Sequence, residues 1–301
     1  MAFNSADINA FKDIWVFCEQ RNGVLMNTDF ELISEGRKLA DERGSQLVGI
    51  LLGHNVEGLA KELGGYGADK IIVCDDPELE VYTTDAYTKV ICDAAMDLKP
   101  EVILLGASNI GRDLGPRCAA RLNTGLTADC THLDIDMNNY VNFLETSSTL
   151  DLSNTKFDME DVNLKMTRPA FGGHLMATII CPRFRPCMST VRPGVMKKAP
   201  FSQEKADACV VEKYPVSLTK EDIKTQVLDV VKEAKQIVDL IGADVIVSVG
   251  RGIGKDIKKG IELAGELADA FGGGVVGGSR VTIDSGWLSA DHQVGQTGKT
   301  V

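Results

Sequence analysis

The chain has 301 residues, 44% of them hydrophobic, and a formal net charge of −11, which together fit a soluble α/β protein of one to two domains. The acidic balance argues against nucleic acid and against an anionic membrane surface as partners. Because no apolar run approaches the roughly 20 residues of a membrane-spanning helix and the N-terminus lacks signal-peptide character, we expect a cytoplasmic protein.

Strand-like apolar runs alternate with amphipathic helical patterns over the first 122 residues. Strands are predicted at residues 14–18, 47–52, 71–74 and 102–105, and helices at about 27–43, 56–64 and 84–98 and from the turn at 106–113 through 122. This alternation predicts an N-terminal Rossmann-like parallel sheet with crossover helices.

A glycine-bearing turn with an arginine, GASNIGRD, occupies residues 106–113. At the carboxyl end of a strand, such a turn can hold an anion through its backbone amides. It can equally be a helix start that contacts another subunit, and the sequence leaves both interpretations open.

The sequence LTADC at residues 126–130 places Asp129 beside Cys130, like a nucleophile with a nearby acid. His132 would lie on the same face of a strand as Cys130, but no other histidine sits at a fitting position, so a Cys/His hydrolase is disfavoured. The eight cysteines are scattered without a C-x-x-C spacing. We therefore expect buried free thiols and neither a zinc nor an iron–sulfur site.

Residues 134–163 are polar, with seven acidic residues against one lysine. We interpret them as a solvated loop or a long hairpin, and a partner-docking loop is the alternative. A charged segment near Pro200 then marks a boundary between predicted domains 1–200 and 201–301. In the second domain a strand is expected at 210–215 and a helix with a wide apolar face at 223–241.

Residues 244–297 fit one β-α-β unit with two glycine-rich turns, each carrying an arginine. A buried parallel strand at 245–249 ends at the turn GRGIG of residues 250–254, and apolar positions at helical spacing follow from 255 to 271. A second strand at 275–276 leads through another glycine break to Ser279 and Arg280. This succession of elements predicts a second α/β domain.

The two glycine turns are candidate ligand-binding loops. Glycine lets the backbone approach a ligand, and the helix dipole favours an anion at the helix start. Ligands of open α/β sheets bind outside the carboxyl ends of the strands, where both arginines emerge, so a pyrophosphate is the expected guest. The spacing of Gly250, Gly252 and Gly254 differs from G-x-G-x-x-G, and by itself it is equally typical of turn and helix-cap glycines.

Three motifs near the C-terminus raise the odds for a ligand site. They are GGSR at 277–280, D-x-G-W at 284–287 and QVGQTGK at 293–299. In these motifs, and in their order, the sequence closely resembles the alpha subunit of the electron transfer flavoproteins. The first domain resembles the same family at residues 106–133, 166–173 and 188–194.

The resemblance implies a flavodoxin-like or deoxyhypusine-synthase-like FAD domain at 201–301 that pivots relative to a scaffold domain at 1–200. Arg280 would lie by the isoalloxazine ring and Thr297 near the flavin N5. Arg251, with the amides of residues 252–254, would face the phosphates or the dimethylbenzene side. The FAD-contacting set that the resemblance implies is Arg251, Gly252, Gly254, Gly278, Ser279, Arg280, Gln293, Val294, Gly295, Gln296, Thr297 and Gly298.

In the first domain the resemblance implies that the scaffold packs against a beta subunit. Arg112, Arg168 and Arg192 are then structural or subunit-interface residues. The family also continues past the position of Val301, with strands carrying G-I-S-G-x-x-Q-H and N-x-D segments that complete the flavin pocket. We therefore expect this chain to be C-terminally incomplete.

The function implied by the resemblance is electron transport, with no catalytic residue and no metal in this chain. The protein would pair with the beta subunit and exchange electrons with an acyl-CoA dehydrogenase-type partner, as in fatty acid β-oxidation. An electron-bifurcating form, dividing electrons from NADH between ferredoxin and an acyl-CoA enzyme, stays open and is weakly favoured by the cysteine content. The alternatives are an NAD-binding deoxyhypusine-synthase-like enzyme, with His292 or Lys299 as catalytic candidates, and a non-catalytic nucleotide-binding module using the turn at 106–112.

Overall fold

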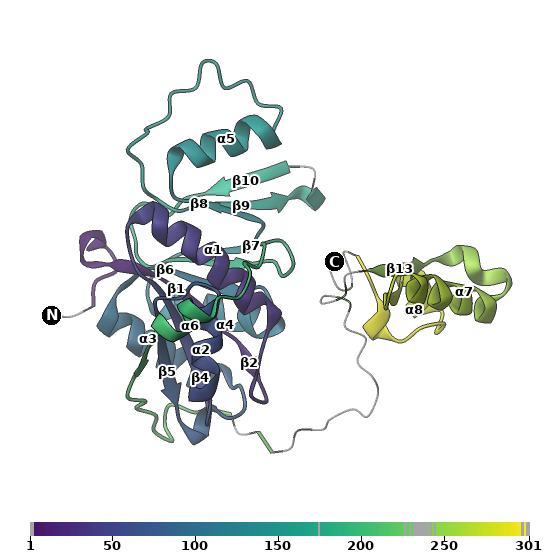
Figure 1. The fold of residues 1–301 in the computed structure, drawn as a ribbon, viewed down its shortest axis with the longest axis horizontal. Coiled ribbons are helices and arrows are strands. Elements are labelled where there is room, and N and C mark those ends of the chain that lie inside the picture. The colour runs from purple at the N-terminus through teal and green to yellow at the C-terminus, as the bar shows by residue number, and fades with distance from the viewer. Residues whose placement is uncertain are drawn as a thin grey trace. The chain divides into compact units, whose positions relative to one another are not determined.

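Two units make up the chain, Met1–Leu228 and Asp229–Val301. The computed structural model describes residues 3–173, 175–225, 227–228, 230, 240, 243, 245–295 and 298. Figure 1 shows the elements of both units.

A parallel sheet of seven strands forms the centre of the first unit, in the order β12-β5-β4-β1-β6-β11-β7. Every neighbouring pair in this sheet runs parallel. The strands are β1 (Lys12–Cys18), β4 (Leu47–Gly53), β5 (Lys70–Asp75), β6 (Pro100–Gly106), β7 (Leu126–Cys130), β11 (Cys187–Val191) and β12 (Val210–Lys213). The predicted α/β class and the four predicted strands of the first 122 residues are confirmed.

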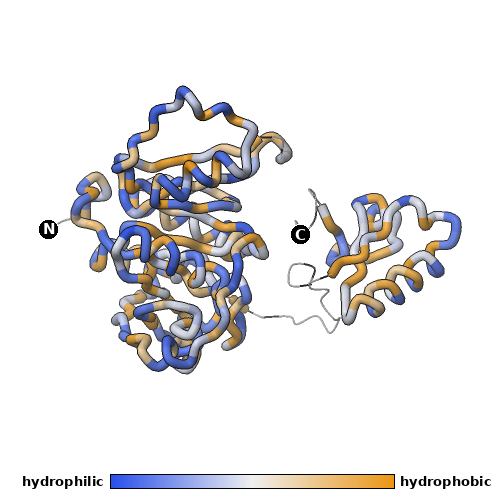
Figure 2. Tube along the Cα trace, turned by 45° about the horizontal axis from the view of Figure 1, so that its top comes forward, coloured by the Kyte–Doolittle hydropathy of each residue, from blue (hydrophilic) through white to orange (hydrophobic). Residues whose placement is uncertain are grey.

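Helices cover both faces of this sheet. α1 (Asn27–Arg43) and α2 (Ala60–Gly65) lie on one face, and α6 (Gln203–Ala208) packs against α2. α3 (Thr84–Leu98) and α4 (Asn109–Arg121) lie on the other face. Successive side chains of β1 alternate between the two cores: Val16 packs toward α1 and Phe17 toward α3. The core strands are the apolar centre of this unit (Figure 2).

A smaller antiparallel sheet, in the order β10-β9-β8, accompanies the large one. Its strands are β8 (His132–Asp134), β9 (Lys165–Ala170) and β10 (Leu175–Ile179). A short hairpin of β2 (Gln20–Arg21) and β3 (Val24–Leu25) follows β1. In the small sheet β10 is an edge strand, and its side chains are largely exposed.

The expectation of a loop or hairpin at 134–163 was wrong, because residues 137–147 form the helix α5 (Met137–Ser147). The Asp136 carboxylate caps this helix by accepting the Asn139 amide at 3.0 Å. Glu42 of α1 accepts the amides of Ile135 and Asp136 at 3.0 and 3.1 Å, which fixes the start of α5 on the first helix. Residues 148–163 then run as an irregular and mostly exposed segment.

The second unit contains the predicted β-α-β arrangement. β13 (Ile246–Val249) pairs in parallel with β14 (Val275–Gly278), α7 (Ile257–Ala270) connects them, and the short helix α8 (Arg280–Asp284) follows. The expected full burial was wrong, since Ile246 and Val247 are only half-buried. On α7, Ala264 and Ala268 are buried, whereas Leu263 and Leu267 are about half exposed and Phe271, which follows the helix, is 64% exposed. A two-stranded sheet covers only a narrow stripe of the helix.

The predicted helix at 223–241 falls mostly outside the described residues. Those of its first residues that are described, 223–225, 227–228 and 230, are not helical. The predicted start of this helix was therefore wrong. Leu218 and Ile223 instead pack on the core beneath α3 and α4.

Candidate functional site

The carboxyl ends of β13 and β14 bring the two predicted glycine turns together. The amide of Ser279 donates to the carbonyl of Val249 at 2.9 Å, so the end of the second strand is tied to that of the first. A side chain built on Gly250 would have its Cβ 3.9 Å from the Ser279 hydroxyl oxygen. The two turns are thus direct neighbours, as expected for consecutive parallel strands.

The QVG segment joins the same edge from the C-terminal side. Gly278 forms a parallel bridge with Gln293, and the Val294 amide donates to the Gly278 carbonyl at 3.0 Å. The amide of Gly298 donates to the carbonyl of Gly295 at 3.0 Å, which closes a tight turn. Gln296 and Thr297, both predicted to contact FAD, lie outside the described residues, as does Lys299.

Both predicted arginines of this edge are exposed. Arg251 begins the 3-10 turn Arg251–Lys255, and Arg280 is the first residue of α8. The Arg280 Nε lies 3.3 Å from the Asp284 carboxylate, and the Arg280 side chain remains 67% exposed. Because a surface ion pair of this kind contributes little, Arg280 can exchange it for a bound anionic group at small cost.

Close packing explains the glycines of the second turn. A Cβ on Gly278 would lie 2.4 Å from the Thr282 hydroxyl oxygen, so a side chain does not fit between β14 and α8.

The first glycine turn is open instead. A Cβ on Gly252 would meet nothing within 4 Å, and the backbone there is open to a ligand. At α7 the Asp256 carboxylate already caps the helix start by accepting the Lys259 amide at 3.1 Å. An anion near this helix would therefore be held by the preceding turn.

The glycine turn of the first unit is satisfied by the protein itself. The Ser108 hydroxyl accepts the Gly111 amide at 3.0 Å, which caps α4, and it also contacts the carboxylate of Glu19. Glu19 is buried at the carboxyl end of β1 and receives the Arg21 guanidinium at 2.6 Å. This internal carboxylate stands at the start of α4, where an external anion would have to bind, so the turn acts as a helix cap and not as a nucleotide site. Glu19 directly follows an apolar strand in the sequence, and this position was the signal that could have indicated an internal partner for the turn.

The first-domain arginines surround one carboxylate. Arg192 and Arg112 place Nη2 atoms at 2.6 and 3.0 Å from the two oxygens of Asp129. Partial burial alone would raise the pKa of Asp129, but its hydrogen bond to Arg192 and the charges of Arg192, Arg112 and Arg168 hold that pKa below the usual value. The three arginines thus stabilise the charged carboxylate of Asp129, which fits the structural role predicted for them.

The Cys/His hydrolase interpretation finds no support in the geometry. Cys130 is fully buried, and its burial raises the pKa of the thiol to about 11, so it is a poor nucleophile. The His132 ring bonds to the Asp134 carboxylate at 2.6 Å and stacks on Phe143 with ring centroids 3.7 Å apart. His132 is thus engaged in attaching α5 to the small sheet.

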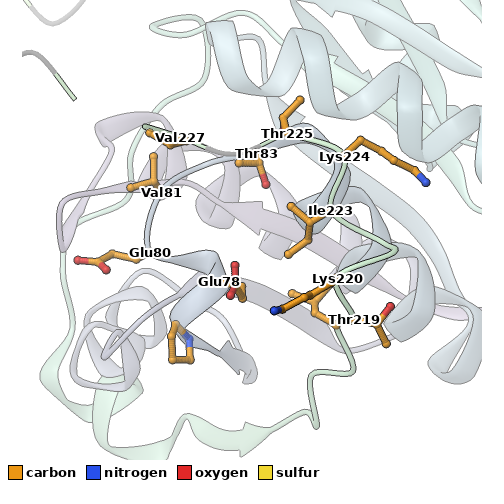
Figure 3. A pocket seen from close by; sticks show the side chains of 12 residues that line it. Glu78, Glu80, Val81, Thr83, Thr219, Lys220, Ile223, Lys224, Thr225 and Val227 are labelled. Carbon is orange, nitrogen blue, oxygen red and sulfur yellow. The ribbon is translucent and has the colours of Figure 1, made fainter. Parts of the chain in front are cut away.

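A separate cavity of about 630 Å³ lies in the first unit between two segments, residues 77–83 and 218–227. Acidic and basic side chains both line it: Lys220 extends toward Glu78, while Glu80 and Lys224 point to opposite sides (Figure 3). The sequence did not predict this cavity, because residues 223–227 were expected to belong to a helix. Its balanced charge favours no particular ligand.

Two further structural findings concern the described part of the chain. It contains no helix that is both long and apolar enough to cross a bilayer. Nor does it contain a cluster of three or more histidine, cysteine, aspartate or glutamate side chains that could hold a metal ion.

Comparison with known proteins identifies both units. Residues 14–219 match the electron transfer flavoprotein domain, and residues 239–301 match the electron transfer flavoprotein FAD-binding domain. The "Acryloyl-CoA reductase electron transfer subunit beta" of Anaerotignum propionicum is 79% identical over the whole chain and 82% of its own length. The "Electron transfer flavoprotein subunit alpha" of Thermoanaerobacterium thermosaccharolyticum is 52% identical over 98% of the chain and 81% of its own length.

A third relative, "Protein FixB" of Clostridium saccharobutylicum, is 50% identical over 98% of the chain and 80% of its own length. The chain thus spans about four-fifths of each relative. Although the first relative is named as a subunit beta, the FAD-binding match and the name of the second relative agree on the alpha type. The chain belongs to the electron transfer flavoprotein family, as a member of its alpha-subunit group with an FAD-binding second domain.

Proposed function

We propose that this chain holds FAD at the joined carboxyl ends of β13 and β14 and passes electrons within a heterodimer with a beta subunit. The observation that carries the proposal is the convergence of the Gly250 turn, Ser279 and the Gln293–Val294 segment on one edge, inside the region that matches the FAD-binding model. Open backbone, a hydroxyl and two exposed guanidinium groups supply the donors that a flavin dinucleotide needs.

The flavin supplies the redox chemistry when bound, and the protein sets its environment. The exposed guanidinium of Arg280 provides a permanent positive charge at this edge, which favours an anionic reduced ring. We propose that Arg251 and the backbone at Gly252, where a Cβ would meet nothing within 4 Å, face the phosphates or the dimethylbenzene side. The narrow space at Gly278 keeps the second turn close to α8.

The partner is proposed from the relatives. Alpha subunits of this family pair with a beta subunit, and the 79% identical relative is named as an electron transfer subunit of acryloyl-CoA reductase. We therefore propose an acyl-CoA dehydrogenase-type enzyme acting on a 2,3-unsaturated acyl-CoA as the redox partner. Electron bifurcation with NADH and ferredoxin is the finer version. It requires two FAD in the heterodimer, whereas a simple carrier would hold one FAD and one AMP.

The small sheet offers the docking surface for the beta subunit. Phe171 is 82% exposed, and Leu175, Met176 and Ile180 are each about half exposed, around β10, the edge strand of the small sheet among the described residues. Such an apolar group next to a free strand edge marks a protein interface. Because the family is heterodimeric, we assign this surface to the beta subunit.

The first experiment is a visible spectrum of the complex purified by co-expression with its beta subunit. Oxidised flavin absorption is expected, and a colourless complex would remove the proposal. In the Arg280→Ala variant the loss of one cation worth about 1 kcal/mol should lower the flavin potential by about 40 mV for a one-electron step. The matched control is Lys258→Ala, which removes a cation from the 90% exposed Lys258 side chain on α7. Equal potentials in the two variants would exclude Arg280 from the flavin site.

The docking surface has its own test. The double substitution Phe171→Ser and Met176→Ser should abolish co-purification of the beta subunit while leaving the far-ultraviolet circular dichroism unchanged. The control is Val24→Ser, which removes a 64% exposed apolar side chain from the β2–β3 hairpin. Retention of the beta subunit by the double variant would place the interface elsewhere.

A further inference from the structure

Two cysteine thiols meet where the small sheet returns to the large one. Cys181 lies two residues after the end of β10, and Cys187 is the first residue of β11. Their thiols are in hydrogen-bonding contact with each other. The Cys187 thiol also lies 3.6 Å from the Cys181 carbonyl, so the five residues between them form a closed loop.

The surroundings make the two thiols unequal. Among the eight cysteines, seven are buried and Cys181 alone is partly exposed. The hydrogen bond from Cys187, despite partial burial, lowers the pKa of Cys181 to about 5. The same contact and burial raise the pKa of Cys187. The lowered pKa of Cys181 favours its thiolate form, and this residue is partly exposed while Cys187 is buried.

A buried arginine holds this loop in place. Arg185 is 4% exposed, and its Nη1 donates to the carbonyls of Cys181 and Phe184 at 2.8 and 3.0 Å. Its Nη2 donates to Asn163 Oδ1 at 2.9 Å. The cationic group fixes the backbone of the loop that carries both cysteines, and its charge opposes the rise in the pKa of Cys187.

A second thiol pair in the same chain provides the contrast. Cys92 of α3 and Cys118 of α4 are also in hydrogen-bonding contact, but both are completely buried. That contact together with burial raises the pKa of Cys118 well above its usual value. Burial of both side chains leaves no path for an oxidant to this second pair.

We propose that Cys181 and Cys187 form a redox-active dithiol that a peroxide oxidises to an intrachain disulfide. The Cys181 thiolate attacks one peroxide oxygen, which breaks the O–O bond and gives a sulfenic acid while the other oxygen leaves as water after protonation. The Cys187 sulfur then attacks the sulfenic sulfur, the S–O bond breaks, and a second water leaves. Overall two thiols and one hydrogen peroxide give one disulfide and two waters. This assignment is independent of the flavin site.

The disulfide would join the end of the edge strand β10 to the start of the internal strand β11. It would convert a polar, hydrogen-bonded loop into a covalent clip between the two sheets. The Cys187 Sγ lies 3.6 Å from the Cys181 carbonyl oxygen, so the two residues are neighbours, as a disulfide requires. A reductant of the thiol class would restore the dithiol.

The experiment treats the purified full chain with one equivalent of hydrogen peroxide, alkylates the remaining thiols after denaturation, and digests the chain with trypsin. Cleavage after Arg183 separates the two cysteines, so the disulfide is detected as two joined peptides that separate on reduction. We expect this linkage in the native protein, with Cys92 and Cys118 recovered in the alkylated form. Recovery of Cys181 and Cys187 as alkylated thiols would overturn the proposal.

Two variants and one alkylation rate test the assignment further. In Cys187→Ser, which keeps a hydrogen-bond donor but has no resolving sulfur, the Cys181 sulfenic acid should accumulate and react with dimedone. Cys181→Ser should show neither the adduct nor the linked peptides. In the unchanged protein, iodoacetamide at pH 7 should alkylate Cys181 at least ~10-fold faster than Cys118. Equal alkylation rates, or peroxide-dependent linkage of Cys92 to Cys118 at the same rate, would refute the assignment even if a variant failed to fold.

Discussion

Neutralising Asp129 tests the charge network of the first unit most directly. This residue has a φ of 65°, a left-handed conformation that asparagine tolerates better than alanine does. Asp129→Asn therefore keeps the shape and the backbone while removing the negative charge between Arg192 and Arg112. The Asp129 amide, which donates to the Thr190 hydroxyl at 2.9 Å, is left unchanged.

The expected loss follows from the two contacts. The 2.6 Å bond to Arg192, whose side chain is 25% exposed, falls in the class of charged hydrogen bonds that contribute about 1.5–3 kcal/mol. The 3.0 Å contact to Arg112 involves a 53% exposed side chain and adds at most ~1 kcal/mol. Because asparagine still accepts one hydrogen bond, we expect a decrease of about 2 kcal/mol in the free energy of unfolding of the first unit.

Urea unfolding at pH 7, followed by the fluorescence of the buried Trp15, measures this loss. Trp287→Phe, made in all proteins, removes the signal of the second unit. The control is Asp41→Asn, which breaks a 2.8 Å ion pair with Arg37 at a 68% exposed carboxylate and should cost under ~1 kcal/mol. The network would be refuted as a source of stability if Asp129→Asn cost no more than the control.

The stabilisation that Asp129 provides should depend on pH. The folded-state pKa of Asp129 lies below its unfolded value, so its stabilisation is present above the unfolded pKa of about 3.9 and is lost as the pH falls through the folded pKa. The difference between the unchanged protein and Asp129→Asn should therefore be constant from neutral pH to about 5 and shrink below about 4. A difference that stayed constant into the acid range would mean that the charge is not its source.

Three further predictions concern other parts of the molecule. Gly278→Ala should cost about 1–3 kcal/mol and release flavin from the complex, because its Cβ would lie 2.4 Å from the Thr282 hydroxyl oxygen; Gly265→Ala, in open space on α7, should cost nothing. Asp136→Ala should remove the cap of α5, lower its stability by about 1 kcal/mol and reduce the helical circular dichroism. Burial raises the pKa of Tyr87 to about 12, so stability should fall as the pH rises from about 10 toward that value, and Tyr87→Phe should flatten this fall.

The parallel architecture could be predicted because its signals are local. Apolar runs such as those of β1 and β4 are bounded by helical patterns of a different period, and the predicted helices at 27–43 and 84–98 coincide with α1 and α3. The insertion of β11 between β6 and β7 could not be predicted in this way. Its position depends on pairing between residues far apart in the sequence, which no periodicity encodes.

The errors have similar physical causes. Polar composition suggested a loop at 134–163, but a cap at Asp136 and contacts from Glu42 support a helix there. At the candidate site, motif order pointed to turns that the fold brings to one edge. Which groups of each turn are already bonded depended on contacts across the fold. The sequence of the turn at 106–112 suits an anion equally well, but in the fold the Glu19 carboxylate contacts Ser108 of this turn.

The position of β12 in the large sheet limits where an expressed fragment of the first unit can end. β12 begins at Val210 and pairs with β5, and Cys209 and Phe201 would be the nearest neighbours of a Cβ on Gly64 and Gly65. A fragment of residues 1–200 alone would lack β12 and leave β5 as an unpaired edge strand that is prone to aggregation. A fragment meant for crystallisation or for labelling should therefore run to residue 228.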